Sequence, residues 1–169
     1  SLIKSLAIKF SRLVKIYDKV DRFICTTSFM RDMLIEAGFN KNKLEIVPTF
    51  SKPLDIKHLN VQKKEYQYIL YFGRVTKIKG IKLLLESFKL FSKKNSNCKL
   101  KIIGRCNEKE KNELFRNIDL NNVVLEDHLD MNSLIKQIIH CKFVIIPSLW
   151  HDNLPNSLLE AFTYRKAVI

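Results

Sequence analysis

Short apolar runs and amphipathic segments alternate along the chain from residue 68 onward, and this alternation limits the possible folds more than any other feature. Runs typical of buried strands occupy 68–72, 99–103, 123–125 and 143–146, and the apolar residues 167–169 close the pattern. Helices are expected between these runs, over 81–93, 108–118, 132–140 and from about Pro155 onward. Strands that alternate with helices predict an α/β fold with a parallel, doubly wound sheet.

The beginning of the chain carries a smaller piece of the same pattern. Residues 1–19 have the spacing of a basic amphipathic helix, and residues 22–27 and 44–47 favour strands. Ser28 is expected to cap a helix that runs to residue 36. Residues 51–66 have no clean period, which is typical of a linker. We therefore expect one domain over 1–50, a linker over 51–66 and a second domain over 67–169.

Composition excludes several classes of protein. The 169 residues are 46% hydrophobic, which argues against disorder, and no apolar run reaches the length that a membrane span needs. The four cysteines lack metal-site or redox spacing, so free thiols in the cytoplasm fit best. The net charge of +13 suits nucleic acid, an anionic membrane or a phosphorylated ligand without choosing among them, and a lysine-rich solvated surface with no charged partner is the favoured interpretation. The basic helix over 1–19 allows contact with the inner membrane face, although packing against its own domain is favoured.

The loop after the strand at 68–72 is the first candidate site, because ligands of open parallel sheets bind beyond the carboxyl ends of the strands. Gly73 permits a close backbone approach, and Arg74 and Lys79 supply two cations before the helix that follows Gly80. This arrangement suits a diphosphate, or else it is a tight turn with two solvated cations. It matches neither common phosphate-loop pattern, G-x-x-x-x-G-K-[ST] or G-x-G-x-x-G.

The loop after the strand at 143–146 carries two carboxylates. Asp152 is expected in the loop ahead of a helix that starts near Pro155, and Glu160 is expected two turns into that helix. A carboxylate can accept hydrogen bonds from both hydroxyls of a ribose, which suits Glu160, and Asp152 can orient a hydroxyl-rich ligand. Trp150 is expected to cover the core rather than a sugar, and His151 and His128 are not assigned to catalysis.

Taken together, these loops resemble a known family. Its motifs are Tyr71-Phe-Gly73-Arg74 with Lys79-Gly80, Leu100 to Gly104, Val144 to Ser148, and Asp152-Asn-Leu-Pro-Asn with Leu159-Glu160-Ala161. In order and spacing they resemble the nucleotide-sugar-binding domain of group-one, family 4-like retaining glycosyltransferases. Residues 20–48 look like the end of the preceding acceptor-side domain. The resemblance implies a fragment that spans parts of both lobes of a GT-B fold, with a Rossmann-like sheet in the second lobe.

The resemblance also implies roles for individual residues. Catalytic roles fall on Arg74, Lys79 and Asp152, and substrate-binding roles on Gly73, Asn153, Leu154 and Glu160. The two cations would hold the donor diphosphate and stabilise the charge that develops on the leaving phosphate. Glu160 would bind the ribose, and Asp152 with the backbone of the two following residues would contact the sugar. Departures from the family pattern are Asp152 in place of Glu, Arg105-Cys106-Asn107 after Gly104, and Arg165 where Gly is common.

The implied function is transfer of a sugar from a UDP- or GDP-sugar to a glycan or lipid-linked acceptor, with retention, in polysaccharide or glycolipid synthesis. The resemblance implies no metal and no separate cofactor, since the nucleotide sugar is a substrate, and the fragment alone is expected to be inactive. Two alternatives remain open. One is a nucleic-acid-binding module driven by the charge, although no known reader motif is present, and the other is a nucleotide-sensing domain without catalysis.

Overall fold

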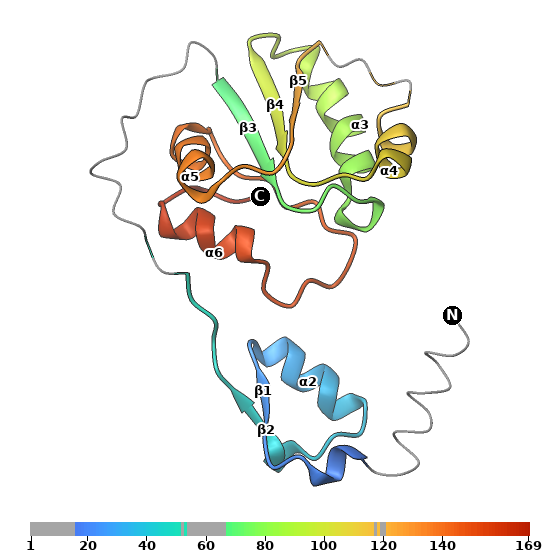
Figure 1. The fold of residues 1–169 in the computed structure, drawn as a ribbon, viewed down its shortest axis with the longest axis vertical. Helices are drawn as coiled ribbons and strands as arrows, with labels where there is room; N and C mark the ends of the chain where they lie inside the picture. The colour runs from blue at the N-terminus through green and yellow to red at the C-terminus, as the bar shows by residue number, and fades with distance from the viewer. Residues whose placement is uncertain (1–15, 52, 54–66, 117, 119–120) are drawn as a thin grey trace. The chain divides into compact units, whose positions relative to one another are not determined.

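A computed structural model describes residues 16–51, 53, 67–116, 118 and 121–169 (Figure 1). The chain forms two compact units, Ser1–Thr49 and Phe50–Ile169, and each is described here by itself. Most of the helix predicted over 1–19 lies outside the described residues, and its end forms the short 3-10 helix η1, Ile16–Lys19. The predicted linker also lies almost entirely outside them.

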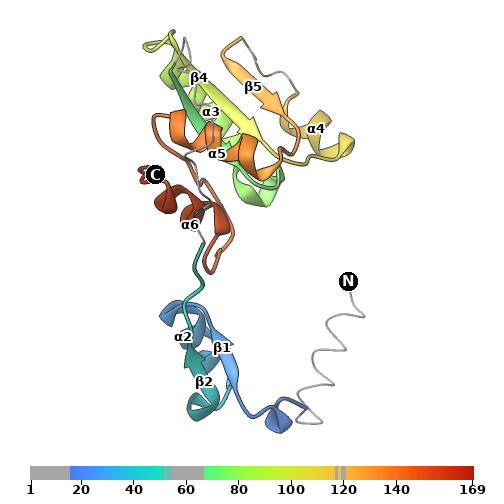
Figure 2. The same cartoon turned by 60° about the vertical axis from the view of Figure 1, so that its left-hand side comes forward.

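The first unit is a small β-α-β arrangement (Figure 2). Strands β1, Phe23–Cys25, and β2, Leu44–Ile46, pair in parallel, and helix α2, Ser28–Glu36, packs against both. A short 3-10 helix, η2, Lys41–Lys43, leads into β2. The cap of α2 is Thr27 rather than the expected Ser28, because the Thr27 hydroxyl accepts a hydrogen bond from the Met30 amide at 3.1 Å.

The second unit is built on a parallel sheet. Strands β3, Gln67–Phe72, β4, Cys98–Ile103, and β5, Val123–Glu126, lie in the order β3-β4-β5. Residues 143–146 extend the sheet beyond β3, since the Ile145 amide donates to the Leu70 carbonyl at 2.9 Å. Residues 167–169 lie beyond them in turn, with the Ile146 amide donating to the Ile169 carbonyl at 2.8 Å. Both segments occupy the places where strands were expected, although each makes only an isolated bridge.

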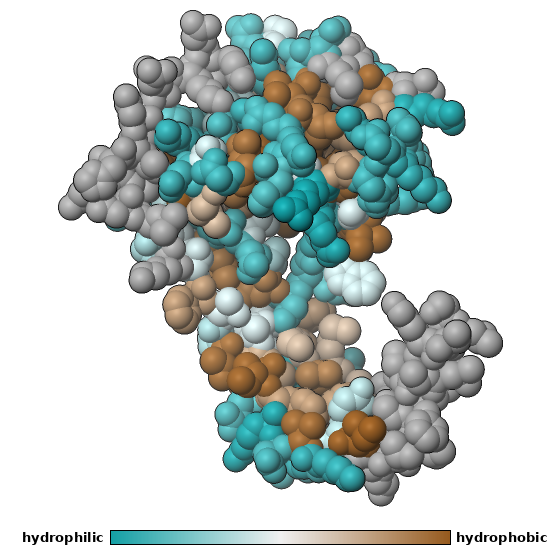
Figure 3. All heavy atoms as spheres, viewed as in Figure 1, coloured by the Kyte–Doolittle hydropathy of each residue, from teal (hydrophilic) through white to brown (hydrophobic). Residues whose placement is uncertain are grey.

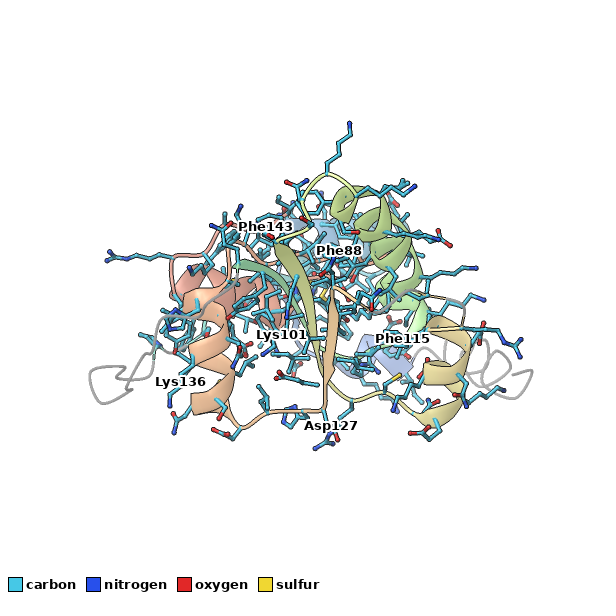
Figure 4. The ribbon with its side chains drawn as sticks, turned by 90° about the horizontal axis from the view of Figure 1, so that it is seen from above. Phe88, Lys101, Phe115, Asp127, Lys136 and Phe143 are labelled. Atoms are coloured by element: carbon cyan, nitrogen blue, oxygen red, sulfur yellow. The ribbon has the colours of Figure 1, made fainter. Side chains whose placement is uncertain are left out.

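Helices cover both faces of this sheet (Figure 4). Helices α3, Ile81–Ser92, and α4, Glu108–Leu114, pack on one face, and α5, Met131–His140, and α6, Asn156–Thr163, pack on the other. Successive residues of β3 point into alternate cores, with Ile69 and Tyr71 toward α3 and Tyr68, Leu70 and Phe72 toward α5. The expected doubly wound α/β fold is confirmed. Helix α4 ends at Leu114, earlier than the predicted residue 118.

Lys101 is a buried charge in the middle of β4. Its ammonium lies 2.6 Å from a Glu126 carboxylate oxygen and donates to the Gln137 side-chain oxygen at 3.0 Å. It also lies 5.7 Å from the centre of the Tyr68 ring, and the Tyr68 hydroxyl donates to the Gln137 carbonyl at 2.7 Å. A buried ammonium needs such partners, because it has left water. This cluster joins β3, β4, β5 and α5 through polar contacts.

Two glycines let the loops at the carboxyl edge of the sheet approach each other. Gly80 has φ +72°, and a Cβ placed there would lie 1.8 Å from the Pro147 carbonyl oxygen. Gly104 has φ +151°, and its Cβ would lie 1.8 Å from the Gly73 carbonyl oxygen. No side chain fits at either position, because such overlap requires the backbone itself to move. The loops after β3, after β4 and after residue 146 are therefore held in direct contact.

Arg165 follows α6 in the left-handed backbone region, with φ 55°. The Arg165 amide donates to the Phe162 carbonyl at 3.0 Å, and the Lys166 amide donates to the Ala161 carbonyl at 2.9 Å, which closes the end of the helix. Glycine is the residue that adopts this conformation without steric cost. A glycine at this position would therefore remove the strain that Arg165 carries.

We predict that Gly104→Ala lowers the free energy of unfolding by about 1–3 kcal/mol more than Gly73→Ala, because both introduce left-handed strain and only the first also overlaps backbone. Gly73 is a matched control, since its φ is +141° and its nearest neighbour, the Tyr71 hydroxyl, would lie at an ordinary 3.6 Å from the new Cβ. Urea unfolding followed by circular dichroism measures both values. Equal losses would show that the close approach at Gly104 does not constrain the fold.

We also predict that Arg165→Gly raises the free energy of unfolding by about 0.5–1 kcal/mol, because it removes the strain of a side chain at positive φ. The same urea titration tests it. The control is Arg116→Gly, an exposed arginine whose φ is not positive. A stabilisation in both variants, or in neither, contradicts the prediction.

Candidate functional site

A cavity of about 830 Å³ opens at the carboxyl edge of the sheet in the second unit. Its walls come from the loops after β3, β4 and β5, from residues 146–155 and from the first turns of α6. The strand order reverses here, because the chain leaves β3 toward β4 and later returns to its other side with residues 143–146. Such a switch point is where doubly wound sheets bind their ligands.

The loop after β3 supplies two cations to this cavity. Arg74 is exposed, and Lys79 ends a short 3-10 helix, η3, Lys77–Lys79. The Tyr71 hydroxyl donates to the Arg74 carbonyl at 2.6 Å, which fixes the backbone of the loop after β3. Burial raises the pKa of Tyr71 well above its usual range, and the nearby Asp152 charge adds to the effect while Arg74 opposes it. Tyr71 is therefore a neutral hydrogen-bond donor at any physiological pH.

Lys79 and Asp152 form an ion pair across the cavity, although 73 positions separate them in the chain. The Lys79 ammonium donates to one Asp152 oxygen at 2.6 Å and to the other at 2.5 Å, and the Ser148 hydroxyl donates to the second oxygen at 2.5 Å. Burial alone would raise the pKa of Asp152. The bonds from Lys79 and Ser148 and the charges of Lys79 and Arg74 outweigh it and lower that pKa.

Glu160 lies on the second turn of α6 and faces the same cavity. It is half-buried, and no other described side chain makes an ion pair or hydrogen bond with its carboxylate. Burial raises the pKa of Glu160 above its usual range. A carboxylate held without a partner in a cavity is suited to accept hydrogen bonds from hydroxyl groups of a ligand.

The structure brings five of the seven predicted site residues to one cavity. Those that line it are Gly73, Arg74, Lys79, Asp152 and Glu160, whereas Asn153 and Leu154 are half-buried in the loop before α6 and do not line it. Sequence reasoning assigned no role to Tyr71, Ser148 or Thr76. Neither the Ser148 contact nor the Tyr71 contact had a local sequence signal, because both depend on how the loops fold.

The loops around the cavity also carry Trp150, two histidines, Arg105 and Thr76. Trp150 does not cover the core, because it is 64% exposed in the loop between Ser148 and Asp152. His128 lines the cavity on the β5 side, together with Arg105 from the β4 loop, and His151 is exposed outside it. Thr76 also lines the cavity. Its hydroxyl oxygen is buried and has no hydrogen-bond partner among the described residues.

Among the described residues, no three His, Cys, Asp or Glu side chains gather as a metal site would require. Nor does any helix among the described residues have the length and apolar character to cross a bilayer. Cys25, Cys98 and Cys141 are free and buried, and Cys106 is free and half-buried, as expected for unpaired thiols.

The second unit is thus a doubly wound α/β domain with cations and carboxylates at its switch point, the place where such domains bind ligands. Residues 54–169 match the family model described as "Glycosyl transferases group 1". The chain therefore belongs to the group 1 glycosyltransferase family, and the resemblance found in the sequence is confirmed.

Similar proteins agree with this assignment. An uncharacterized glycosyltransferase of Methanocaldococcus jannaschii is 33% identical over an alignment of 149 positions that covers 80% of this chain and 36% of that protein. The chain thus spans about a third of that relative. TarM of S. aureus, crystallised with UDP, fondaparinux and α-GlcNAc-glycerol, superposes with a TM-score of 0.72 at 23% identity, over 89% of this chain and 30% of TarM.

A second solved structure is the pneumococcal O-GlcNAc transferase GtfA in complex with UDP and GlcNAc. Its TM-score is 0.68 at 19% identity, and the match covers 90% of this chain and 30% of GtfA. At these identities the likeness establishes the fold, so the expected GT-B architecture is confirmed for the described residues.

We predict that Asp152→Asn lowers the free energy of unfolding by about 1–3 kcal/mol at neutral pH, because it leaves the largely buried Lys79 ammonium without its counter-charge. The folded pKa of Asp152 is lowered, so this stabilisation is complete above the ordinary carboxyl pKa of about 4 and disappears as the pH falls through the lowered value. The difference between parent and variant should therefore shrink on acidification.

Urea unfolding between pH 7 and pH 3 measures this difference. Glu113→Gln is the control, since it breaks the exposed Lys77–Glu113 pair, and exposed pairs contribute about 0–1 kcal/mol. A difference between parent and Asp152→Asn that does not depend on pH would show that the Lys79–Asp152 pair contributes nothing through charge.

Proposed function

We propose that this chain forms the donor-binding part of a glycosyltransferase that takes a sugar from a nucleotide diphosphate sugar. One observation carries the proposal: two cations and a half-buried carboxylate without a partner converge on one cavity at the switch point of the sheet. Family membership supports it, and so do the UDP complexes of TarM and GtfA, which share the fold. We propose UDP as the donor nucleotide to test first, with GDP as the alternative.

The charges of the cavity suit the parts of such a donor. Arg74 has no ion-pair partner among the described residues, so its guanidinium is available to bind the diphosphate bidentately. Lys79 gives two hydrogen bonds to Asp152, and its third N–H is left for a phosphate oxygen. As the bond from the sugar to the diphosphate breaks, its electrons move to the leaving oxygen, where both cations stabilise the charge.

The carboxylates then hold the two ends of the donor that carry hydroxyl groups. Glu160, which lacks a partner, accepts hydrogen bonds from the ribose diol. Asp152 keeps lone pairs free beside its bonds from Lys79 and Ser148, and one of these accepts from a hydroxyl of the transferred sugar. Asn153 and Leu154 directly follow Asp152 in the chain, so we propose their backbone as further sugar contacts, although neither residue lines the cavity. We also propose that Gly73 leaves room for the phosphates.

The finer features of the reaction are proposed on family grounds. They are retention of anomeric configuration, catalysis without a metal because Arg74 and Lys79 take that part, and a glycan or lipid-linked acceptor in polysaccharide or glycolipid synthesis. We propose a cytoplasmic location with peripheral membrane contact, and the charge of +13 supports attraction to an anionic surface. Because the chain spans 36% of its relative, we expect it to bind donor without turning it over.

We predict that the chain binds UDP and that Arg74→Ala weakens binding about 10- to 100-fold, the effect of losing a charge-assisted contact of about 1.5–3 kcal/mol. Glu160→Gln should weaken binding of UDP more than binding of free diphosphate, which has no ribose. Isothermal titration with UDP, GDP, ADP and diphosphate measures these affinities. Arg116→Ala is the control, since it removes the same charge from an exposed position outside the cavity wall.

The alternatives give different results in the same titrations. Binding that ignores the base, responds equally to Arg74→Ala and Arg116→Ala, and vanishes with salt would indicate a nucleic-acid or other polyanion surface. A nucleotide sensor would bind UDP as predicted. In the longer protein, however, a sensor would show no sugar transfer that Arg74→Ala could abolish. Transfer that is abolished by Arg74→Ala while the fold persists distinguishes the transferase.

A further inference from the structure

Arg105, in the loop after β4, is a third cation of the cavity wall, and the proposed function gives it no role. It is exposed, and its side chain makes no ion pair or hydrogen bond with any described residue. Glu110 lines the same cavity, but its carboxylate accepts a hydrogen bond from the Asn107 side chain at 2.7 Å and forms no ion pair with Arg105. Arg105 is therefore a cation of this wall without a counter-charge in direct contact.

The backbone holds the loop after β4 against the loop after β3. The Val75 amide donates to the Arg105 carbonyl at 3.0 Å, and Gly104 lies against the Gly73 carbonyl. Arg74 directly precedes Val75, so the two arginines come from backbone segments that are in contact. Figure 3 shows strongly hydrophilic side chains on the second unit where these two loops leave the sheet. Like charges on neighbouring loops repel each other, so this part of the wall favours an anion.

The strand order sets the order of the charges along the carboxyl edge of the sheet. Strand β4 lies on one side of β3, and residues 143–146 lie on the other. The loop after β3 therefore lies between the loop that carries Arg105 and the loop that carries Asp152. Lys79, from this middle loop, is bonded to Asp152. Arg105 is thus at the end of the row that is farther from Asp152, with the loop of Arg74 between them.

A nucleotide diphosphate sugar has its parts in a matching linear order. The sugar is joined to the outer phosphate, and the inner phosphate is joined to the nucleoside. With the sugar at Asp152, the outer phosphate lies at Lys79 and Arg74, and the inner phosphate lies toward the loop after β4. We propose that Arg105 binds this inner phosphate, with its guanidinium donating two parallel N–H bonds. The proposal rests on the proposed function, because it takes the direction of the donor from Asp152.

Arg105 then differs from the other two cations in its effect on the reaction. The inner phosphate keeps its charge throughout, because the bond that breaks joins the sugar to the outer phosphate. Arg105 therefore binds donor, transition state and released nucleotide equally well, whereas Arg74 and Lys79 stabilise the charge that develops on the outer phosphate. In the longer protein, Arg105→Ala should raise the KM for the donor about tenfold without lowering kcat.

Ligands that differ by one phosphate test this assignment by isothermal titration of the chain, with weak ligands measured as competitors of UDP. Arg105→Ala should weaken binding of UMP and of UDP by the same factor, about tenfold, because both contain the inner phosphate. Uridine has no phosphate and should bind the variant and the parent equally. Arg74→Ala should give a different pattern, since it weakens binding of UDP more than binding of UMP.

Two further variants separate a direct contact from a general effect of charge. Arg116→Ala removes the same charge from an exposed position outside the cavity wall, and it should leave the affinities for all three ligands unchanged. Arg105→Lys keeps the charge but loses the planar fork of the guanidinium, so it should recover only part of the UMP affinity. Urea unfolding of each variant should match that of the parent, since both arginines are exposed.

Each contrary result overturns the inference. Weaker binding of uridine by Arg105→Ala would assign this side chain to the base, and unchanged binding of UMP would leave it a solvated cation. Equal losses in Arg105→Ala and Arg116→Ala would indicate an unspecific attraction by the net charge. UDP binding that depends on Arg74 but not on Arg105 rejects only this inference, whereas a chain that binds no UDP rejects the proposed donor site as well.

Discussion

The close approach of loop backbones at the carboxyl edge of the sheet is the constraint on which the site depends. Gly80 lies against Pro147 and Gly104 lies against Gly73, at distances that exclude any side chain. Because of these contacts, a cation from the first loop and an acid from a loop about 70 residues later share one cavity. Local sequence preferences determine the helices and strands, but Gly80 and Gly104 allow the loops between them to come together and form the cavity.

The charged side chains in the cavity fall into a mutually paired set and an unpaired set. Lys79 and Asp152 neutralise each other and hold two loops together, whereas Arg74 and Glu160 have no ion-pair partner among the described residues. This leaves a positive group toward one part of the cavity and a hydrogen-bond acceptor toward another. A nucleotide has the complementary pattern, with an anionic diphosphate next to a neutral diol.

Much of the fold was readable from the sequence, because strands buried on both faces are continuously apolar and the loops after them carry charge. The contacts of the site were less readable. Nothing in the sequence sets Lys79 against Asp152, since their distance follows from the strand order. Lys101 shows the same limit: the alternation of β4 resembles a half-exposed strand, yet Glu126 and Gln137 from other elements bury its ammonium.

Trp150 and the end of α4 were missed for a related reason. Apolar character predicts burial only on average, so the exposure of a tryptophan in a loop has no local sequence signal. Helix α4 stops at Leu114 because Phe115 turns away from helical geometry to pack on the α3 face, which is a tertiary preference.

The strand order also determines at which point in the synthesis of the chain the cavity forms. Ribosomal synthesis delivers β3 first, then β4 and β5 on one side of it, and only afterwards residues 143–169 on the other. A partly made chain can thus form three paired strands and the Arg74 loop while the opposite wall is still missing. Residues 143–169 complete the crevice, so a ligand of the crevice binds only the completed sheet and stabilises it relative to the earlier intermediates.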